Sequence, residues 1–233
     1  MVTDCLNCST RVEEVWSWRG LFYRETQFLC QECESQLEKI EGERCRGCSR
    51  SMEALPSNLV KEEICLDCHR WEMDPGWKGI LHNNDSLYHY NNFLKEYLAK
   101  YKYRGDYALS KAFSNTIKSY LAKIEYDHII PIPLSDERFY ERGFNQSTAL
   151  LEESEVRPSH ILTRLHSEKQ SKKTRAERLR QVQVFQLGEC DVKGKSVLLF
   201  DDIYTTGTTL RQAAKLLKEA GAGEVSSLTL ARG

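Results

Sequence analysis

Two adjacent carboxylates and a cluster of threonines, within residues 201–209, are the residues best suited to chemistry. They follow a short apolar run, residues 197–200, in the stretch VLLFDDIYTTGTT. Adjacent carboxylates repel each other, so a fold tolerates them where solvent, a cation or hydroxyl donors lie nearby. The threonine hydroxyls are neutral hydrogen-bond donors. Acceptors at one end and donors at the other predict a ligand that carries both hydroxyl groups and a phosphate.

Eight of the nine cysteines form four CxxC pairs within the first 68 residues. In a reducing compartment such pairs are typical metal ligands rather than disulfides. Two pairs complete a tetrahedral four-cysteine site, so the sequence predicts two zinc ions per chain. A redox-active CxxC is the alternative, but redox motifs usually occur singly. The predicted metal ligands are Cys5, Cys8, Cys30, Cys33, Cys45, Cys48, Cys65 and Cys68.

The spacing leaves open which pairs share an ion. Sequential pairing makes two consecutive zinc ribbons, and interleaved pairing is the alternative. Residues 12–29 are rich in β-branched and aromatic residues around Gly20, which predicts a ribbon hairpin and favours sequential pairing. So small a segment has little core, so metal would supply much of its folding energy. We expect Cys190 to be a packed or surface thiol, and His69 not to be a ligand, because four thiolates already fill the adjacent site.

The composition is that of an ordinary globular protein. The chain has 233 residues, of which 40% are hydrophobic and 29% charged, and its formal net charge is -1. Its overall charge therefore gives no attraction to nucleic acid or to anionic membranes. No apolar run is long enough to span a membrane, and residues 1–10 lack the apolar core of a signal peptide. We expect a cytoplasmic protein with no membrane insertion.

Helices and strands alternate after residue 78. The spacing of apolar residues predicts helices over residues 91–103, 106–124 and 209–221 and another from residue 145. Short apolar runs predict strands at residues 128–134, 184–187, 197–200 and 224–232. The alternation predicts an α/β fold, a mostly parallel sheet with flanking helices. Proline and glycine around two tryptophans indicate a boundary or linker near residues 70–79, so we expect a double zinc-ribbon region at residues 1–78 and a second domain at residues 79–233.

In open α/β sheets, ligands bind at the carboxyl ends of the strands. The strand at 197–200 would carry Asp201 and Asp202 to that edge, and the threonines would form the turn into the next helix. Gly207 lets the backbone approach a ligand closely, and the helix N-terminus offers unpaired N–H groups. The sequence has no GxxxxGK[ST] motif, which argues against an ordinary ATPase or GTPase. These features predict a phosphate cradle.

The stretch DDIYTTGTT resembles the phosphoribosyl pyrophosphate (PRPP) loop of type I phosphoribosyltransferases. A double CxxC region, a KYRGD turn, a PIPL strand, the motif ERGFNQ and this loop occur in that order. Together they resemble the ComF family of competence proteins over nearly the whole chain. The resemblance implies a type I phosphoribosyltransferase-like domain fused to a zinc-binding region. It also implies a role in natural transformation, beside a ComFA-type DNA helicase that acts on incoming single-stranded DNA.

The resemblance also implies roles for individual residues. Asp201 and Asp202 would accept hydrogen bonds from the ribose hydroxyls of PRPP, and Arg142 of ERGFNQ would contact an anion. As catalytic candidates these three would act together with Mg²⁺, because the charge of the pyrophosphate leaving group must be offset. The 5-phosphate would be held by Thr205, Thr206, Gly207, Thr208 and Thr209.

A basic stretch at residues 166–178 matches in position the loop that closes over pyrophosphate in such enzymes. The match is partial, because Lys173 stands where Leu is usual and Gln181 where Asn is expected. Contact of Lys172, Lys173 and Arg175 with pyrophosphate and contact with the DNA backbone are both open. A group of aromatic residues also offers stacking for bases, although packing within the ribbon hairpin explains them more simply: Trp16, Trp18, Phe22 and Tyr23.

Two classes of function follow. The chain is either a PRPP-binding protein of DNA uptake or an active phosphoribosyltransferase that transfers ribose 5-phosphate to an unidentified acceptor, with no direct DNA role. No acceptor pocket can be recognised in the sequence. We therefore favour the PRPP-binding competence protein and keep the enzyme as the alternative.

Overall fold

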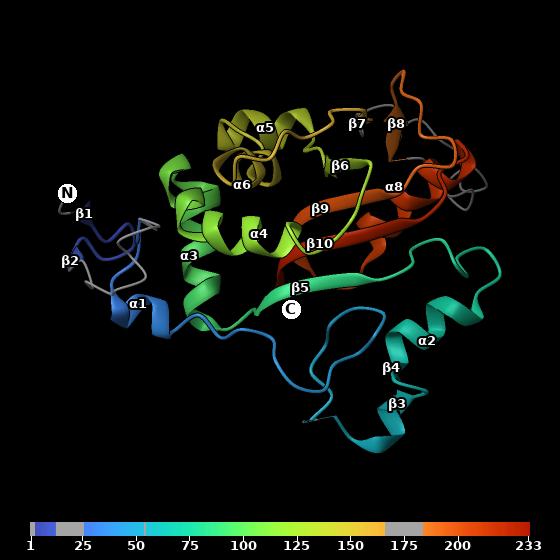
Figure 1. Ribbon diagram of the computed structural model, residues 1–233, viewed down its shortest axis with the longest axis horizontal. Coiled ribbons are helices and arrows are strands. Elements are labelled where there is room, and N and C mark those ends of the chain that lie inside the picture. The colour runs from blue at the N-terminus through green and yellow to red at the C-terminus, as the bar shows by residue number, and fades with distance from the viewer. Residues whose placement is uncertain (1–2, 13–25, 54, 166–183) are drawn as a thin grey trace.

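A four-stranded parallel sheet lies at the centre of the protein (Figure 1). The computed structural model describes residues 3–12, 26–53, 55–165 and 184–233. The strands lie in the order β5-β10-β9-β6, and helices pack on both faces of the sheet. This arrangement confirms the predicted α/β fold. The strands are β5 (Asn84–His89), β6 (His128–Pro131), β9 (Val197–Tyr204) and β10 (Val225–Arg232).

One face of the sheet is covered by helices from the middle of the chain. Side chains alternate between the two faces along a strand, and Leu198 and Phe200 of β9 pack here against buried residues such as Leu94, Phe113 and Leu150. The covering elements are α3 (Asn92–Tyr103), the 3-10 helix η3 (Tyr107–Phe113), α4 (Ser114–Leu121) and α6 (Gln146–Glu153).

The opposite face is covered by a single long helix and part of the N-terminal region. Helix α8 (Thr208–Glu219) buries Ala213 and Leu217 in the same cluster as Val197 and Leu199 of β9. In the part of the chain that the structure describes, no helix has both the length and the apolar character needed to cross a membrane.

The N-terminal region contains two small units with the same local build. The first unit contains the CxxC pairs that begin at Cys5 and Cys30, and the second contains those that begin at Cys45 and Cys65. In each unit the first CxxC pair lies in a turn, where the amide of Ser9 or Ser49 donates to the carbonyl of Cys5 or Cys45 at 2.8 Å. Both serines have a left-handed backbone, with φ of 60° and 57°. The second pair begins a helix, α1 (Gln31–Ser35) or α2 (Leu66–Met73).

The short strands of the two units also correspond. In the first unit β1 (Thr3–Asp4) pairs antiparallel with β2 (Arg11–Val12). In the second unit Arg44 and Ser51 form the equivalent bridge. The second unit further contains the 3-10 helix η2 (Ser57–Leu59) and the antiparallel pair β3 (Val60–Lys61) and β4 (Ile64–Cys65).

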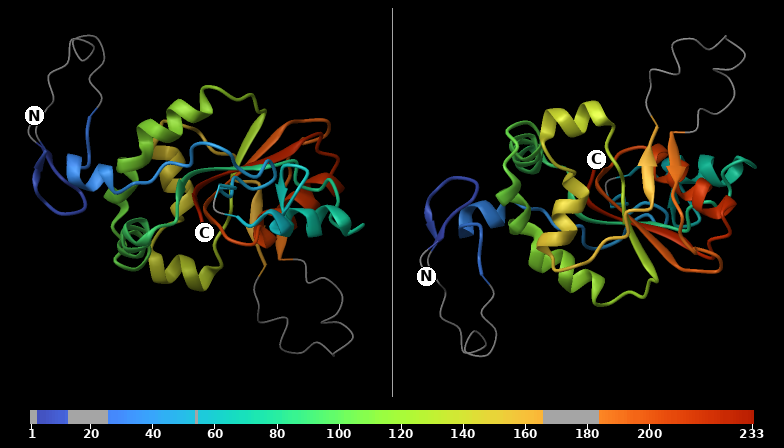
Figure 2. Two further views of the ribbon diagram at one scale, coloured as in Figure 1. Left: turned by 90° about the horizontal axis from the view of Figure 1, so that it is seen from below. Right: turned by 90° about the horizontal axis from the view of Figure 1, so that it is seen from above.

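The two units join different hydrophobic cores. Cys5 and Cys33 of the first unit belong to the cluster with α3, whereas Cys45 and Cys65 of the second belong to the cluster with α8. Figure 1 shows the first unit at one end of the molecule, beyond α3, and the second unit below β5. Figure 2 shows the same arrangement from two further sides. The division of the chain at residue 78 stays a prediction.

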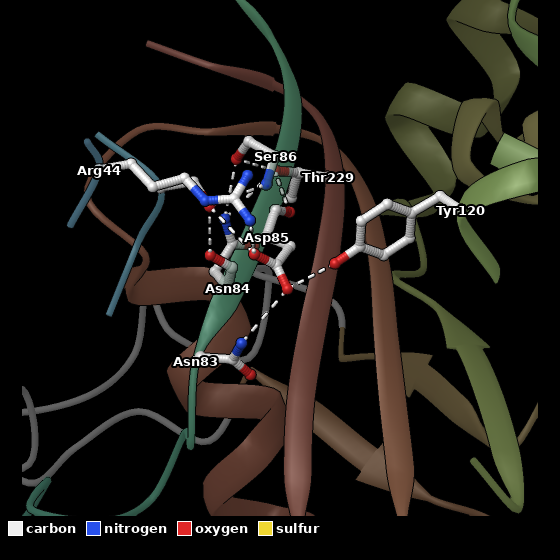
Figure 3. Close-up of polar contacts among 8 residues, drawn as sticks. Arg44, Asn83, Asn84, Asp85, Ser86, Tyr120 and Thr229 are labelled. Atoms are coloured by element: carbon white, nitrogen blue, oxygen red, sulfur yellow. Dashed lines mark hydrogen bonds and ion pairs between the residues drawn. The ribbon is translucent and has the colours of Figure 1, made fainter. Parts of the chain in front are cut away.

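Strand β5 was not among the predicted strands, and its buried polar residues explain why. Asn84 and Ser86 are buried, yet both are satisfied across the sheet (Figure 3): the Ser86 and Thr229 hydroxyls lie 2.7 Å apart, and the Asn84 amide donates to Ser86 at 2.9 Å. Ser49 of the second unit donates to the Asn84 carbonyl at 3.0 Å. These bonds dock the second unit on the edge strand of the sheet.

Several local predictions need correction. Residues 136–142 form helix α5 (Asp136–Arg142) instead of a polar turn, because Ser135 caps its start and Gly143, with φ 78°, ends it. The predicted helix at 106–124 is divided into η3 and α4. Strand β8 (Phe185–Leu187) pairs antiparallel with β7 (Leu162–Arg164) in a separate ribbon. The predicted ribbon hairpin and the basic stretch lie largely outside the described residues.

Candidate functional site

Asp201 and Asp202 lie within β9, which runs further than the apolar stretch predicted. Strand β6 pairs with β9 only as far as Pro131 opposite Phe200. The two acids therefore lie past the end of β6, at the carboxyl edge of the sheet, where one flank of β9 is not paired by β6. This is the edge at which open parallel sheets bind ligands.

The threonine loop, residues 205–209, connects β9 to α8 through a glycine that no other residue can replace without strain. Gly207 caps α8 with φ +77°. A Cβ atom placed there would lie 2.2 Å from the Tyr204 hydroxyl oxygen. Both the backbone conformation and the lack of space therefore require glycine at this position.

The threonine loop presents hydroxyls around the N-terminus of a long helix. Thr205, Thr206 and Thr208 are exposed, and the Thr206 and Thr208 hydroxyls lie 2.9 Å apart. The first N–H groups of an α-helix have no intrahelical partner and carry a partial positive charge. The loop and the start of α8 thus present hydroxyl and amide donors on one side, and binding of an anion there stays a prediction.

Asp201 is held by hydrogen bonds at one carboxylate oxygen. Its Oδ1 accepts from the Ser147 hydroxyl at 3.1 Å and from the Asp202 amide at 2.9 Å. Burial, together with the negative charge of Asp202, raises the pKa of Asp201 to about 7. Near neutral pH this side chain can therefore exchange a proton, and the ionised form can accept hydrogen bonds from ligand hydroxyls.

Asp202 forms an ion pair with Lys102, the next-to-last residue of α3. Their side chains are 14% and 15% exposed, so the pair is largely desolvated. Lys102 belongs to the KYRGD turn but was not predicted as a site residue. The structure brings a cation to the acids from a helix about 100 residues earlier in the chain.

Arg142 lies at the end of α5 and contacts the start of α6. Its Nη1 donates to Gln146 Oε1 at 2.8 Å, and its guanidinium lies 5.9 Å from the centre of the Tyr103 ring. Gln146 precedes Ser147, the residue that donates to Asp201. The ERGFNQ motif thus brings Arg142 near the acids through one turn of helix, although the structure shows no direct contact between them.

The eight cysteines of the CxxC pairs form two groups, in chain order. The first cysteine group is Cys5, Cys8, Cys30 and Cys33, and the second is Cys45, Cys48, Cys65 and Cys68. Within each group all sulfur atoms lie within 4.8 Å of one another. The grouping corresponds to the sequential alternative, and within the described residues it leaves no interleaved set.

The geometry of both groups fits a zinc ion. Zn–S bonds of about 2.3 Å place the sulfurs of a tetrahedral site roughly 3.8 Å apart. Cys8 and Cys30 lie 3.6 Å apart, and Cys48 and Cys65 lie 3.7 Å apart, with no disulfide among the nine cysteines. In the second group, hydrogen bonds among the sulfurs lower the pKa of Cys45 and raise the pKa of Cys68, as expected for thiols that share protons at close range.

The second cysteine group lies close to the threonine loop, a proximity that the sequence did not indicate. The indole Nε1 of Trp71, in α2, donates to the Thr206 carbonyl at 3.2 Å. Arg232 Nη2 lies 3.6 Å from Cys48 Sγ, and its Nη1 donates to the Tyr204 carbonyl at 3.3 Å. These contacts join residues 135 and 184 positions apart, so no local pattern reveals them.

The C-terminal part of the chain matches a known domain family. The phosphoribosyl transferase domain family matches residues 148–233, which contain β9, the threonine loop, α8 and β10. A glutamine PRPP amidotransferase structure from B. subtilis aligns with 52% of this chain and 26% of that chain, at 21% identity and a TM-score of 0.37. The family match and the parallel sheet identify a domain with the type I phosphoribosyltransferase fold.

Relatives of nearly full length then give the family. The chain is 41% identical to competence protein ComFC of Bacillus subtilis (strain 168), covering 98% of this chain and 94% of the relative. It is 32% identical to competence protein ComFC of Streptococcus pneumoniae, over 98% and 99% of the two chains. Competence protein F of Haemophilus influenzae is 25% identical, over 88% and 97%. The protein belongs to the ComF family of competence proteins.

Proposed function

We propose that the protein binds PRPP at the carboxyl edge of its sheet and acts in DNA uptake during natural transformation. The observation that carries this proposal is the arrangement of Asp201 and Asp202 beside the threonine loop and the N-terminus of α8. The acids would accept hydrogen bonds from the ribose hydroxyls, and residues 205–209 would donate to the 5-phosphate. Membership of the ComF family supports the cellular role, and we propose with it a ComFA-type helicase as partner and the cytoplasm as location.

The ion pair between Lys102 and Asp202 shapes how PRPP would bind. A ribose hydroxyl can donate to Asp202 only if Lys102 shares or releases that carboxylate. A Lys102 ammonium released in this way would lie beside the ribose, near the charge of the pyrophosphate group. Mg²⁺ would supply further positive charge there, and Arg142 is the candidate to contact the same group through its guanidinium.

Positive charge also gathers at the base of the ribbon that leads to residues 166–178. Burial lowers the pKa of Arg164, and the neighbouring positive charge of Arg138 adds to this shift. Two cations this close are relieved by an anion, as a pyrophosphate group or a DNA phosphate would provide. Asp201 is also near enough to oppose the shift, which brings Arg164 into the vicinity of the acids.

The test is calorimetric titration of the zinc-loaded protein with PRPP and Mg²⁺. Wild type should bind saturably, and the double variant Asp201→Asn/Asp202→Asn should not. Asp127→Asn, which alters an exposed acid on the loop before β6, serves as the matched control and should bind as wild type. Absence of binding by wild type would overturn the proposal.

Single-stranded DNA is a second candidate ligand, favoured by exposed aromatic residues next to arginines. Tyr103 is 73% exposed, Phe139 52% and Tyr140 92%, on α3 and α5, which contact each other. Exposed rings stack on bases, and Arg104 and Arg138 can contact phosphates. In the double variant Phe139→Ala/Tyr140→Ala we expect oligonucleotide binding, followed by fluorescence anisotropy, to weaken while PRPP binding is kept.

Activity as a phosphoribosyltransferase is the alternative function. In that case a nucleophile would attack C1 of the ribose, the C1–O bond would break, and pyrophosphate would leave with the bonding electrons. Release of pyrophosphate that depends on an added acceptor, and that is lost in Asp201→Asn/Asp202→Asn, would establish it. If such a variant still supports transformation, the role in DNA uptake does not need the site.

A further inference from the structure

Helix α2 connects the second cysteine group to the threonine loop, because it carries residues that belong to the group and a residue that contacts the loop. Cys65 caps this helix and Cys68 lies in its first turn. Trp71 follows one turn later and donates its indole N–H to the Thr206 carbonyl at 3.2 Å. A helix that begins with two of the predicted metal ligands therefore makes a direct hydrogen bond to the backbone of the threonine loop.

Arg232 forms a second connection, from the end of β10. It is only 6% exposed, and it contacts Cys48 Sγ through one nitrogen and the Tyr204 carbonyl through the other. Its guanidinium also lies 4.9 Å from the centre of the Tyr204 ring. Tyr204 immediately precedes the threonine loop, so one side chain joins a cysteine sulfur to the start of that loop.

A third connection passes through Arg211 of α8. This residue is 2% exposed, donates to the Tyr204 hydroxyl at 3.2 Å and lies 4.9 Å from the centre of the Trp71 ring. The Tyr204 ring, placed between the two arginines, fills the space beneath Gly207. Trp71, Tyr204, Arg211 and Arg232 therefore form one packed cluster between the second cysteine group and the threonine loop.

The charges in this cluster favour a metal-loaded second group. Within the described residues neither Arg211 nor Arg232 forms an ion pair with a carboxylate, and the Nε atom of each is buried without a hydrogen-bond partner. A buried charge is costly unless it is compensated. Four thiolates around a divalent zinc ion carry a net negative charge. A loaded second group would thus offset the arginines that hold Tyr204, whereas four neutral thiols would not.

We propose that the second cysteine group, when loaded with metal, positions the threonine loop for anion binding, with Trp71 and Arg232 as positioning residues. This inference rests on the proposed metal and PRPP sites. It assigns the second group a task that the first does not share, because the described contacts of the first group are to α3 and not to the threonine loop.

The first experiment measures amide hydrogen exchange of the zinc-loaded full chain without ligand. Trp71→Phe keeps an aromatic ring beside Arg211 but removes the N–H that donates to Thr206. Trp77→Phe is the matched control, because Trp77 packs edge-on against Trp71 at 5.3 Å without a hydrogen bond to the loop. The amides of Arg211 and Gly233 donate to the Gly207 and Tyr204 carbonyls at 2.9 Å each. These two amides should exchange about three- to tenfold faster in Trp71→Phe and at the wild-type rate in Trp77→Phe. Equal rates in both variants would overturn the proposal.

The second experiment separates this inference from the proposed function. Both variants should hold two zinc ions per chain, and the PRPP dissociation constant should rise about three- to tenfold in Trp71→Phe alone. If wild type binds no PRPP, the proposed function fails, while the exchange measurement still decides whether the loop is held. Unchanged PRPP affinity in Trp71→Phe, with PRPP bound by wild type, would contradict the coupling.

The metal itself is tested by removing one ligand from each group. Cys48→Ser and Cys8→Ser should each lose one zinc ion, measured by mass spectrometry under native conditions. Exchange at the Arg211 and Gly233 amides should accelerate in Cys48→Ser only. If Cys48→Ser does not fold, Trp71→Phe, which leaves all four cysteines in place, carries the test; acceleration in Cys8→Ser to the same extent would overturn the proposal.

Discussion

The two cysteine groups share a local build and differ in almost everything around them. The first exposes Cys8 and lies at one end of the molecule, where Asn7 donates to Cys33 Sγ at 3.3 Å and accepts from Lys100 Nζ at 2.9 Å. All four cysteines of the second are buried, in the same core cluster as Leu199 of β9 and Leu217 of α8. The CxxC spacing therefore predicts metal binding equally for both groups, whereas the surrounding residues determine which parts of the fold would depend on the metal.

Helix α3 contacts both Asn7, beside the first group, and Asp202. Lys100 contacts Asn7, and Lys102, two residues later, pairs with Asp202. These side chains point to nearly opposite sides of the helix. We therefore expect the first group to support the helix without setting the geometry of the site.

The largest expected effect is the difference in stability between Cys48→Ser and Cys8→Ser. Loss of metal from the buried second group should lower the free energy of unfolding by about 4 kcal/mol or more, because its core is shared with the sheet. Loss from the first group should cost less and affect mainly residues 3–12 and 26–37. Chemical denaturation of both variants measures the difference, and equal losses would remove the distinction between the groups.

The next effect is expected at Gly207, on the loop that the second group holds. Gly207→Ala meets both a left-handed backbone and the Tyr204 hydroxyl, so PRPP affinity should fall at least about tenfold. Gly194→Ala is the control, since Gly194 has φ +70° with nothing within 4 Å of a Cβ. It should lose about 1–2 kcal/mol of stability and keep PRPP affinity, which calorimetry can establish.

The pH dependence of stability tests the contribution of Asp201, which is separate from that of either cysteine group. The pKa of Asp201 is raised from 3.8 to about 7, so the folded state holds this proton more tightly than the unfolded state. Its contribution to stability is present below pH 4 and is lost as the pH rises to about 7. Asp201→Asn should remove this loss, which denaturation between pH 5 and pH 8 can detect.

PRPP affinity should depend on pH in the opposite sense. Ionised Asp201 accepts hydrogen bonds from hydroxyls, so affinity should increase, by at most about tenfold per pH unit, until about pH 7. The titration of PRPP itself is common to wild type and Asp201→Asn. An identical pH dependence in the two proteins would show that Asp201 does not titrate in the binding range.

The smallest effect is expected from Asn7→Ala in the first group. Removal of the donor to Cys33 should cost about 1 kcal/mol of stability and weaken zinc binding by that group. PRPP affinity should not change, in contrast to Trp71→Phe. A change in PRPP affinity would mean that α3 transmits the state of the first group to Asp202.

Much of the site could be predicted because its chemistry is contiguous in the chain. The acids, the threonines and Gly207 fall within residues 201–209, and each CxxC pair is a local motif. The missing parts are tertiary. Lys102, Trp71 and Arg232 reach the site from distant segments. Trp71 and Arg232 stand in no distinguishing pattern, and the KYRGD motif that contains Lys102 does not indicate that its cation meets Asp202.

Strand β5 and helix α5 were missed for different physical reasons. β5 buries Asn84 and Ser86, which a hydrophobic pattern reads as loop residues, and only their partners on β10 make burial acceptable. α5 buries no residue, so no apolar periodicity marks it, and its capping residues define it instead. The sequence therefore predicted elements with an apolar face and failed where polar contacts decide the structure.

The order of the strands has a consequence for synthesis of the protein. β10, which follows the other three strands in the chain, lies between β5 and β9. β5 and β9 therefore cannot complete their pairing until β10 has been synthesised, and such long-range pairing is slow. The cysteines of the second unit emerge more than 150 residues before Arg232. Until then the sheet lacks a central strand, so β5 and β9 each expose an unpaired edge of the kind that makes folding intermediates prone to aggregation.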